Sequence, residues 1–314
     1  MQNCNCNDGY IMQMQNFSVN DGDGIRTTIF LYGCPLHCIW CCNPENAYCP
    51  EQEMHHMTLD EVDKKISRQA LFYRGNGGGI TFSGGEATVQ QGFLRAMVNR
   101  FYDKGYDLSL ETCGAFSFDE VKDILQKMSR IFMDLKLFDD KLHRFFTGAS
   151  NAVILKNIRR TAALQVPMVV RIPVIVGVNA FKENIEATCA FLEEVQSSHP
   201  AAPFMTADGQ ESGPADISLE FLPYHRYGMD KYTKLGIPDP DARYEMLRGQ
   251  ANGRLENSRA EQQMEPGMIQ DMHNVESFPH GFSFAERMEI PSEKLLEKYR
   301  EIAAAHHIRT VSFR

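Results

Sequence analysis

"RTTIFLYGCPLHCIWCCNPE", residues 26–45, joins a strand-like run to a loop that contains four of the nine cysteines in the chain. The first half is rich in β-branched and aromatic residues, which favour a strand. In the second half, Cys34, Cys38 and Cys41 follow the spacing C-x3-C-x2-C. Each residue extends a chain by at most about 3.6 Å, so these three thiols can converge on one bound group. The stretch therefore predicts a metal or cluster site directly after a strand.

Strand-like and helix-like segments alternate along most of the chain. Further strand-like runs occupy residues 78–84, 106–112, 130–136, 168–176 and 217–223, and helix-period stretches occupy residues 58–72, 89–104, 117–128, 151–165 and 181–197. Thr58, Ser117 and Asn151 are N-cap candidates for three of these helices. Six strand–helix units predict an α/β fold with a parallel sheet and crossover helices.

Two segments interrupt this alternation and are predicted to be surface insertions. Residues 198–216 are rich in Pro, Gly, Ala and Ser, and residues 245–289 are long, polar and weakly periodic. Apolar residues are spaced among charges in the second segment, as expected for one that becomes ordered on a partner: Met264, Met268, Ile269 and Phe282. The alternation resumes with a predicted helix over residues 291–307 and a last strand over residues 308–313.

Charge and hydropathy exclude two classes of partner. The 314-residue chain has a formal net charge of −9, and no run of basic residues is typical of nucleic-acid binding. The most apolar stretch, residues 166–178, is interrupted by Arg171 and is shorter than a membrane span of roughly 18 residues. No secretory signal is visible at the start. We therefore expect a cytoplasmic protein whose cysteines are metal ligands, catalytic thiols or core residues rather than disulfides.

The number of thiols in the loop suggests what they hold. Three thiolates do not complete a structural zinc site, which needs four ligands. They suit an iron–sulfur cluster in which one iron stays open for a small molecule. A zinc site completed by Cys42, Cys49 or His55 is the alternative.

The C-x3-C-x2-C loop after a first strand, in a chain of six strand–helix units, resembles the radical S-adenosylmethionine (SAM) superfamily. "TFSGGE" (81–86) after the second strand is similar to the family's GGE element, which meets the amino group of SAM. The resemblance implies a partial (βα)6 barrel with a C-terminal helix and strand extension. It also implies one [4Fe–4S] cluster, whose unique iron chelates SAM and whose electron cleaves SAM to a 5′-deoxyadenosyl radical.

A narrower resemblance is carried by motifs in order along the chain. They are "DGDGIR" (21–26), "CCNPE" (41–45), "ETCG" (111–114), "DLK" (134–136), "TGASN" (147–151), "VRIPVIVG" (170–177) and "FLPYHRYGMDKY" (221–232). Together they resemble the activating enzymes of glycyl-radical enzymes. The implied function is abstraction of a hydrogen atom from a backbone glycine of a partner enzyme, with a flavodoxin or ferredoxin as electron donor. A radical SAM enzyme acting on a small metabolite, and a non-catalytic zinc or iron–sulfur module, are the alternatives.

The resemblance also assigns roles to residues of this chain. Cys34, Cys38 and Cys41 would hold the cluster, and no side chain is needed as an acid or base because the cofactor carries the chemistry. The residues matched to the SAM pocket are Trp40, Cys42, Gly84, Gly85, Glu86, Asp134, Leu135, Lys136, Arg171 and His225. Glu111 and Thr112, with Asp134, match positions that can hold a monovalent cation.

The chain departs from the family pattern at several positions. Asp23 replaces the proline of the D-G-P-G-I-R element, and Cys42 stands where histidine or serine is more usual. Residues 46–57 contain only Cys49, so a ferredoxin-like insert with further clusters is not expected. Cys4, Cys6 and Cys49 are expected to be free thiols. The predicted organisation is an N-terminal tail over residues 1–15 and a radical SAM core over residues 16–314.

Overall fold

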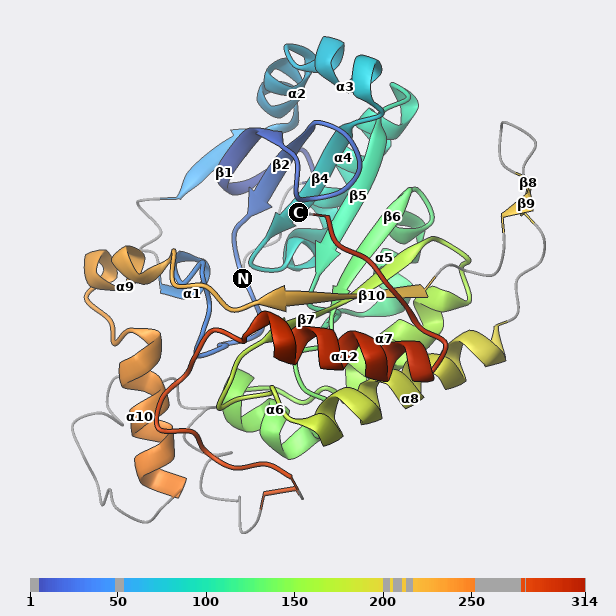
Figure 1. Cartoon of the computed structure of the whole chain (residues 1–314). Helices are drawn as coiled ribbons and strands as arrows, with labels where there is room; N and C mark the ends of the chain where they lie inside the picture. The colour runs from blue at the N-terminus through green and yellow to red at the C-terminus, as the bar shows by residue number, and fades with distance from the viewer. Residues whose placement is uncertain are drawn as a thin grey trace.

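The computed structural model describes residues 6–48, 54–199, 204–205, 211–212, 217–251, 278–279 and 281–313. Its centre is a nine-stranded sheet with the strand order β11-β10-β7-β6-β5-β4-β2-β1-β3 (Figure 1). From β2 to β11 all neighbouring strands are parallel. The predicted α/β fold with a mostly parallel sheet is therefore confirmed.

The six predicted strands form the parallel part of this sheet. They are β2 (Arg26–Leu31), β4 (Gly79–Gly84), β5 (Asp107–Thr112), β6 (Arg130–Asp134), β7 (Met168–Val174) and β10 (Ile217–Pro223). The last strand, β11 (Arg309–Thr310), pairs with β10 and is shorter than predicted. Because these strands are parallel, their carboxyl ends meet at one edge of the sheet.

Two strands at the other side of the sheet were not predicted. Strand β1 (Asp8–Ser18) pairs antiparallel with β2, and β3 (His55–Thr58) pairs antiparallel with β1. Residues 8–15, which the sequence assigns to a tail, thus belong to the sheet. Polar residues such as Gln13 and Gln15 make β1 hard to recognise in the sequence. This part of the sheet is half exposed, so its residues do not alternate regularly between apolar and polar.

Helices connect the parallel strands and cover the sheet. They are α1 (Glu45–Tyr48), α2 (Leu59–Ser67), α3 (Ala70–Asn76), the 3-10 turn η2 (Ala87–Gln90), α4 (Gln91–Asp103), α5 (Phe118–Leu125), α6 (Asp140–Thr147), α7 (Ala152–Ala162), α8 (Lys182–Ser198), α9 (Met229–Leu235), α10 (Pro240–Ala251) and α12 (Glu293–Ala305). Thr58 caps α2 through a reciprocal bond pair with Glu61. Ser117 and Asn151 occupy the predicted cap positions, but their side chains accept no capping hydrogen bond.

The two faces of the parallel strands differ in chemistry. On β7, the side chains of Met168, Val170 and Ile172 join the apolar core between sheet and helices. The residue between the last two, Arg171, points to the opposite, concave face. Figure 1 shows α8 and α12 lying side by side on the helix-covered face. The concave face is therefore left for polar groups.

Parts of both predicted insertions form secondary structure in the described residues. Within residues 198–216, Phe204–Met205 and Glu211–Ser212 form a small antiparallel hairpin, β8 and β9. Within residues 245–289, α10 continues to Ala251, and Val176 forms an antiparallel bridge with Glu289.

The last part of the second insertion belongs to an apolar cluster beside α6. The ring of Phe282 lies 6.0 Å from that of Phe146 and 5.7 Å from that of Phe181. The rings of Phe278 and Phe284 pack on Phe145 of α6. Phe282 therefore packs within this chain, and the contact with a partner that the sequence suggested for it stays a prediction. Met264, Met268 and Ile269 lie outside the described residues.

Candidate functional site

The cysteine loop lies at the carboxyl ends of the parallel strands. Cys34, Cys38 and Cys41 all line one cavity of about 330 Å³ at this edge. Backbone bonds fix the loop on two sides: the amide of His37 donates to the carbonyl of Thr147 at 2.8 Å, and the amide of Glu86 donates to the carbonyl of Gly33 at 2.7 Å. The three thiols are thus held by the end of α6 and by the loop after β4.

Residues from each parallel strand from β2 to β10, or from the loops that follow them, contribute to the cavity wall. Strand β2 itself contributes Phe30. The loop and helix that follow β2 contribute Cys34, Leu36, His37, Cys38, Trp40, Cys41, Cys42, Asn43, Pro44, Asn46, Ala47 and Tyr48. The later elements contribute Ser83, Gly84, Gly85, Glu111, Thr112, Cys113, Asp134, Lys136, Arg171, Pro173, Leu222, Pro223, Tyr224, His225 and Arg243. The predicted site residues that line it are the three ligand cysteines, Trp40, Cys42, Gly84, Gly85, Asp134, Lys136, Arg171 and His225. The strand-end positions chosen from the sequence therefore meet in space.

The environment of the three thiols differs between them. Burial raises the pKa of the Cys38 thiol to about 12, and burial also raises the pKa of Cys41. A hydrogen bond from Cys113 lowers the pKa of the Cys34 thiol. Cys42 is exposed. A bound metal favours thiolates over thiols, so the buried cysteines need such a group to lose their protons near neutral pH.

The spacing of the thiols tests which group fits. In the part of the chain that the structure describes, no three His, Cys, Asp or Glu side chains gather tightly enough to hold a single metal ion. The three cysteines nevertheless surround one cavity, an arrangement that suits a polynuclear cluster with one thiolate per iron better than a mononuclear zinc site. His55, an alternative zinc ligand, is exposed on β3 and does not line the cavity, and Cys4 and Cys49 lie outside the described residues.

Gly84 and Gly85 are required by the packing of the chain itself. A Cβ atom at Gly84 would lie 2.0 Å from the carbonyl oxygen of Leu31, and the φ angle of Gly84 is +126°. A Cβ atom at Gly85 would lie 2.4 Å from the carbonyl oxygen of Gly33 and 2.8 Å from Cγ of Asn46. Both glycines line the cavity. Their first constraint, however, is the close approach of the β4 loop to the cysteine loop.

Glu86 and Leu135 do not line the cavity, although both were predicted in the SAM pocket. The carboxylate of Glu86 is buried and accepts bonds from the Thr88 hydroxyl at 2.7 Å, the Thr112 hydroxyl at 2.8 Å and the Cys113 amide at 2.7 Å. It ties the loop after β4 to the loop after β5. Leu135 packs in the apolar core on the other side of the sheet. Glu86 thus acts on the cavity wall through its neighbours.

Two ion-pair groups fill the polar interior. The ammonium of Lys136 contacts the carboxylate of Asp134 at 2.6 Å. Burial alone would lower the pKa of Lys136, but the charge of Asp134, the thiols of Cys38 and Cys113 and the hydrogen bond to Asp134 together more than offset this, and the pKa is raised. Arg171 contacts the carboxylates of Glu111 at 2.5 Å and Glu220 at 2.8 Å. Both groups keep charges fixed at the wall of the cavity.

The predicted cation position is built differently from the expectation. Glu111 accepts bonds from Ser83 and Arg171, and Thr112 donates to Glu86. Asp134 accepts from Lys136. All three residues line the cavity, yet each already has a partner within the chain. The monovalent cation stays a prediction.

Several wall residues were not singled out from the sequence. Cys113 lies inside the quoted "ETCG" element, and its thiol forms a hydrogen bond with that of Cys34, a partner that only folding reveals. Asn46 follows "CCNPE" and contacts Gly85. Arg243 lies in α10, in a stretch without any motif. Asn46 could have been found from the sequence, because it lies one residue beyond the matched element "CCNPE". No sequence signal pointed to Arg243.

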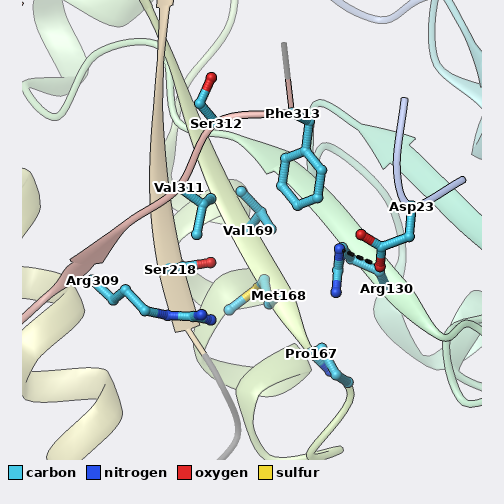
Figure 2. Close-up of a pocket in the computed structure, with 10 residues that line it drawn as sticks. All are labelled: Asp23, Arg130, Pro167, Met168, Val169, Ser218, Arg309, Val311, Ser312 and Phe313. Atoms are coloured by element: carbon cyan, nitrogen blue, oxygen red, sulfur yellow. Dashed lines mark ion pairs between the residues drawn. The ribbon is translucent and has the colours of Figure 1, made fainter. Parts of the chain in front are cut away.

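A second cavity, of about 320 Å³, opens at the amino ends of the strands (Figure 2). Figure 2 shows Arg130 paired with Asp23 at 2.8 Å, with Phe313 beside them. The amide of Phe313 donates to Glu220, so the last described residues cross the concave face below the ion pairs. None of the residues predicted for the site lines this second cavity. The cysteine-lined cavity at the opposite ends is the candidate site.

Comparison with known families agrees with this geometry. Residues 28–192 match the model of the radical SAM superfamily. A solved radical SAM methyltransferase from Sphaerobacter thermophilus shares the fold, with a TM-score of 0.50, 12% identity, and coverage of 96% of this chain and 76% of that chain. Membership of this superfamily implies a [4Fe–4S] cluster and SAM.

Two relatives narrow the class further. The isethionate sulfite-lyase activating enzyme of Nitratidesulfovibrio vulgaris is 30% identical over 293 residues, covering 74% of this chain and 89% of that enzyme. The enzyme of the same name from Oleidesulfovibrio alaskensis is 31% identical over 295 residues, covering 74% of this chain and 88% of that enzyme. The chain belongs to the radical SAM superfamily and, within it, to the activating enzymes of glycyl-radical enzymes.

Among the helices of the described residues, none combines the length and the apolar character that crossing a bilayer requires.

Proposed function

We propose that this protein binds one [4Fe–4S] cluster through Cys34, Cys38 and Cys41 and uses SAM to remove a hydrogen atom from a backbone glycine of a partner enzyme. The observation that carries the proposal is the meeting of these cysteines with residues of five further strands around one cavity. When bound, the reduced cluster and SAM supply the radical chemistry. The residues of the chain bind, orient and exclude water.

We assign the roles of the wall residues from their positions. Trp40, the backbone of Cys42 and His225 flank the cavity beside the cysteine loop, where the adenosyl part of SAM would lie. Gly84, Gly85, Asp134 and Lys136 line the same cavity, where the methionine part would lie. Arg171 is held by Glu111 and Glu220 and keeps the floor of the cavity rigid. Glu86 positions Thr112 and Cys113 on this wall.

The partner and the electron donor follow from the same class. The relatives named above activate an isethionate sulfite-lyase, and we infer a glycyl-radical enzyme as the protein substrate here. A flavodoxin or ferredoxin would deliver the electron. A cluster with an open iron is sensitive to oxygen, so we place the reaction in an anaerobic cytoplasm, where thiols also persist; the seven cysteines among the described residues are all unpaired.

The test uses the anaerobically purified chain. We expect a brown protein with about four irons per chain, the number that the cluster type requires. With reductant it should cleave SAM to methionine and 5′-deoxyadenosine, and with its partner it should generate a glycyl radical visible by electron paramagnetic resonance. Turnover of SAM with a small metabolite and no radical on any partner would favour the alternative enzyme. A colourless protein with one zinc would contradict the proposal.

A further inference from the structure

Cys113 is a buried thiol beside one of the three proposed cluster ligands. It follows β5 directly, is 5% exposed and lines the cysteine-lined cavity. Its thiol forms a hydrogen bond with that of Cys34. Cys113 therefore contacts a ligand sulfur although it does not belong to the C-x3-C-x2-C set.

Glu86 fixes Cys34 and Cys113 relative to each other. The amide of Glu86 donates to the carbonyl of Gly33, the residue directly before Cys34, at 2.7 Å. The carboxylate of Glu86 accepts a bond from the amide of Cys113, also at 2.7 Å. Glu86 is only 1% exposed, and a bond to a buried carboxylate is among the stronger hydrogen bonds of a protein. One residue thus holds the backbone on both sides of the thiol pair.

The turn after Cys113 is fixed as well. Gly114 has a φ angle of +76°, and a Cβ atom there would lie 3.0 Å from Cγ2 of Ile154. The amide of Gly114 donates to the Thr112 hydroxyl at 3.0 Å, and its carbonyl accepts from the side-chain amide of Asn157 in α7 at 2.8 Å. The end of β5 and α7 therefore hold Cys113 in place at the cavity wall.

The chemistry of the pair decides which thiol donates once iron is bound. An iron ligand must be a thiolate, so Cys34 then has no proton and can only accept. Cys113 keeps its proton and has one S–H donor. Hydrogen bonds to ligand sulfurs help to set the reduction potential of iron–sulfur clusters. Because reduction adds negative charge, a donor at the ligand sulfur stabilises the reduced form.

We propose that the Cys113 thiol donates a hydrogen bond to the Cys34 sulfur and thereby raises the reduction potential of the bound cluster. This inference rests on the proposed function, because it requires a cluster held by Cys34. Cys113 is a positioning residue, since it acts on the cluster through Cys34. Its effect is to make the cluster easier for an external electron donor to reduce.

Two other roles for Cys113 make different predictions. If its side chain only filled space in the wall, its loss would leave the potential of the cluster unchanged. If Cys113 were itself an iron ligand, it would keep iron on the protein when Cys34 is replaced. The potential and the iron content therefore separate the three roles.

The experiment is an anaerobic potentiometric titration of the cluster-loaded enzyme without SAM, followed by electron paramagnetic resonance of the reduced cluster. Cys113→Ala and the larger Cys113→Val both remove the donor, whereas Cys113→Ser keeps one. Cys189→Ala is the matched control, because Cys189 is a fully buried cysteine of the apolar core that does not line the cavity. Iron per chain is measured for each variant, and also for Cys34→Ala and Cys34→Ala/Cys113→Ala.

We expect Cys113→Ala and Cys113→Val to lower the ratio of reduced to oxidised cluster at a given potential about fivefold, the loss of one typical hydrogen bond. At 59 mV per tenfold for a one-electron couple, this is a shift of about 40 mV to more negative potential. Cys113→Ser and Cys189→Ala should stay within about twofold of the native ratio.

An unchanged potential in the variants without a donor, or an equal shift in Cys113→Ser, would overturn the inference. Iron retained by Cys34→Ala but lost from Cys34→Ala/Cys113→Ala would also overturn it, because Cys113 would then be a ligand. If Cys113→Ala loses its iron, Cys113→Val gives the comparison with Cys113→Ser. A native chain that binds no cluster would contradict the proposed function itself, whereas a native cluster with an unshifted Cys113→Val contradicts only the role of Cys113.

Discussion

Replacing Arg171 by methionine should remove the charge that holds the carboxylates of Glu111 and Glu220 on the concave face. Arg171 is 7% exposed and contacts Glu111 at 2.5 Å and Glu220 at 2.8 Å, and its guanidinium carbon lies 3.8 Å from the ring centre of Phe132. Methionine fills a similar volume and preserves the packing on the ring. The change therefore isolates the electrostatic contribution of this group.

The expected loss of stability is large because the carboxylate of Glu220 is left almost fully buried and that of Glu111 only partly exposed, with 2% and 19% of the two side chains exposed. Breaking a buried ion pair costs about 3–5 kcal/mol, whereas an exposed pair contributes about 1 kcal/mol or less. Arg159 pairs with Glu194 at 2.8 Å on the surface, with 41% and 61% of the two side chains exposed. Arg159→Met is therefore the matched control, and it should lose about 1 kcal/mol at most.

The loss should also grow with pH. Burial raises the pKa of Glu111 in the folded chain, while the Arg171 charge lowers it in part. A carboxyl whose folded pKa is raised contributes stability below its unfolded pKa and loses that contribution as pH rises through the folded pKa. Without Arg171 the folded pKa of Glu111 rises further. The deficit of Arg171→Met should consequently be larger at pH 8 than at pH 5.5.

Anaerobic urea denaturation of the native chain and both variants at these two pH values measures the effect. The double variant Arg171→Met/Glu220→Gln should recover part of the loss, because it removes one of the two stranded charges. The reasoning is refuted if Arg171→Met is no less stable than Arg159→Met. A deficit that stays constant or shrinks towards pH 8 would refute the assigned role of Glu111.

Three other perturbations test separate parts of the site. Replacing Cys34, Cys38 or Cys41 by alanine should abolish iron binding and SAM cleavage, whereas Cys42→Ser should retain the iron; equal iron loss in Cys42→Ser would show that the ligand set is wrong. Gly85→Ala should lower iron content as well as SAM affinity, since its Cβ would meet the carbonyl oxygen of Gly33, 2.4 Å away; normal iron content would mean that the loop yields easily. Replacing residues 252–277 by a Gly/Ser linker should leave iron content and uncoupled SAM cleavage unchanged but reduce glycyl-radical formation on the partner. Full activation by the shortened enzyme would show that this segment does not serve partner recognition.

The deletion ends at residue 277 because the residues that follow pack against the rest of the chain, which the sequence did not predict. Residues 245–289 read as one polar insertion, because the apolar residues in it are few and widely spaced. Phe278, Phe282 and Phe284 nevertheless pack against α6, and Tyr244 of α10 is buried in the same cluster. No local sequence pattern predicts this packing, because the partner residues Phe145 and Phe146 lie more than a hundred residues earlier in the chain.

The glycines and Glu86 show a similar division. Their place beside the site was predictable, because a Gly-Gly-Glu element at a strand end in a parallel sheet meets the other strand ends. Their contacts were not. Gly85 lies in close contact with Gly33 and Asn46. The Glu86 carboxylate does not line the cavity and instead accepts hydrogen bonds from Thr112 and Cys113. Side-chain direction at a strand end depends on the loop that follows, which the period of a strand does not determine.

The sequence by itself determined the parallel sheet and the cysteine loop. Apolar runs of strand length between helix-period segments fix the sheet, and Cys34, Cys38 and Cys41 stay close in any fold because few residues separate them. Only the tertiary structure decided that β1 joins the sheet, that Arg171 lies between Glu111 and Glu220, and that Arg243 enters the cavity wall. Those contacts join residues far apart in the chain, and they follow from how the crossovers pack and which way each side chain points.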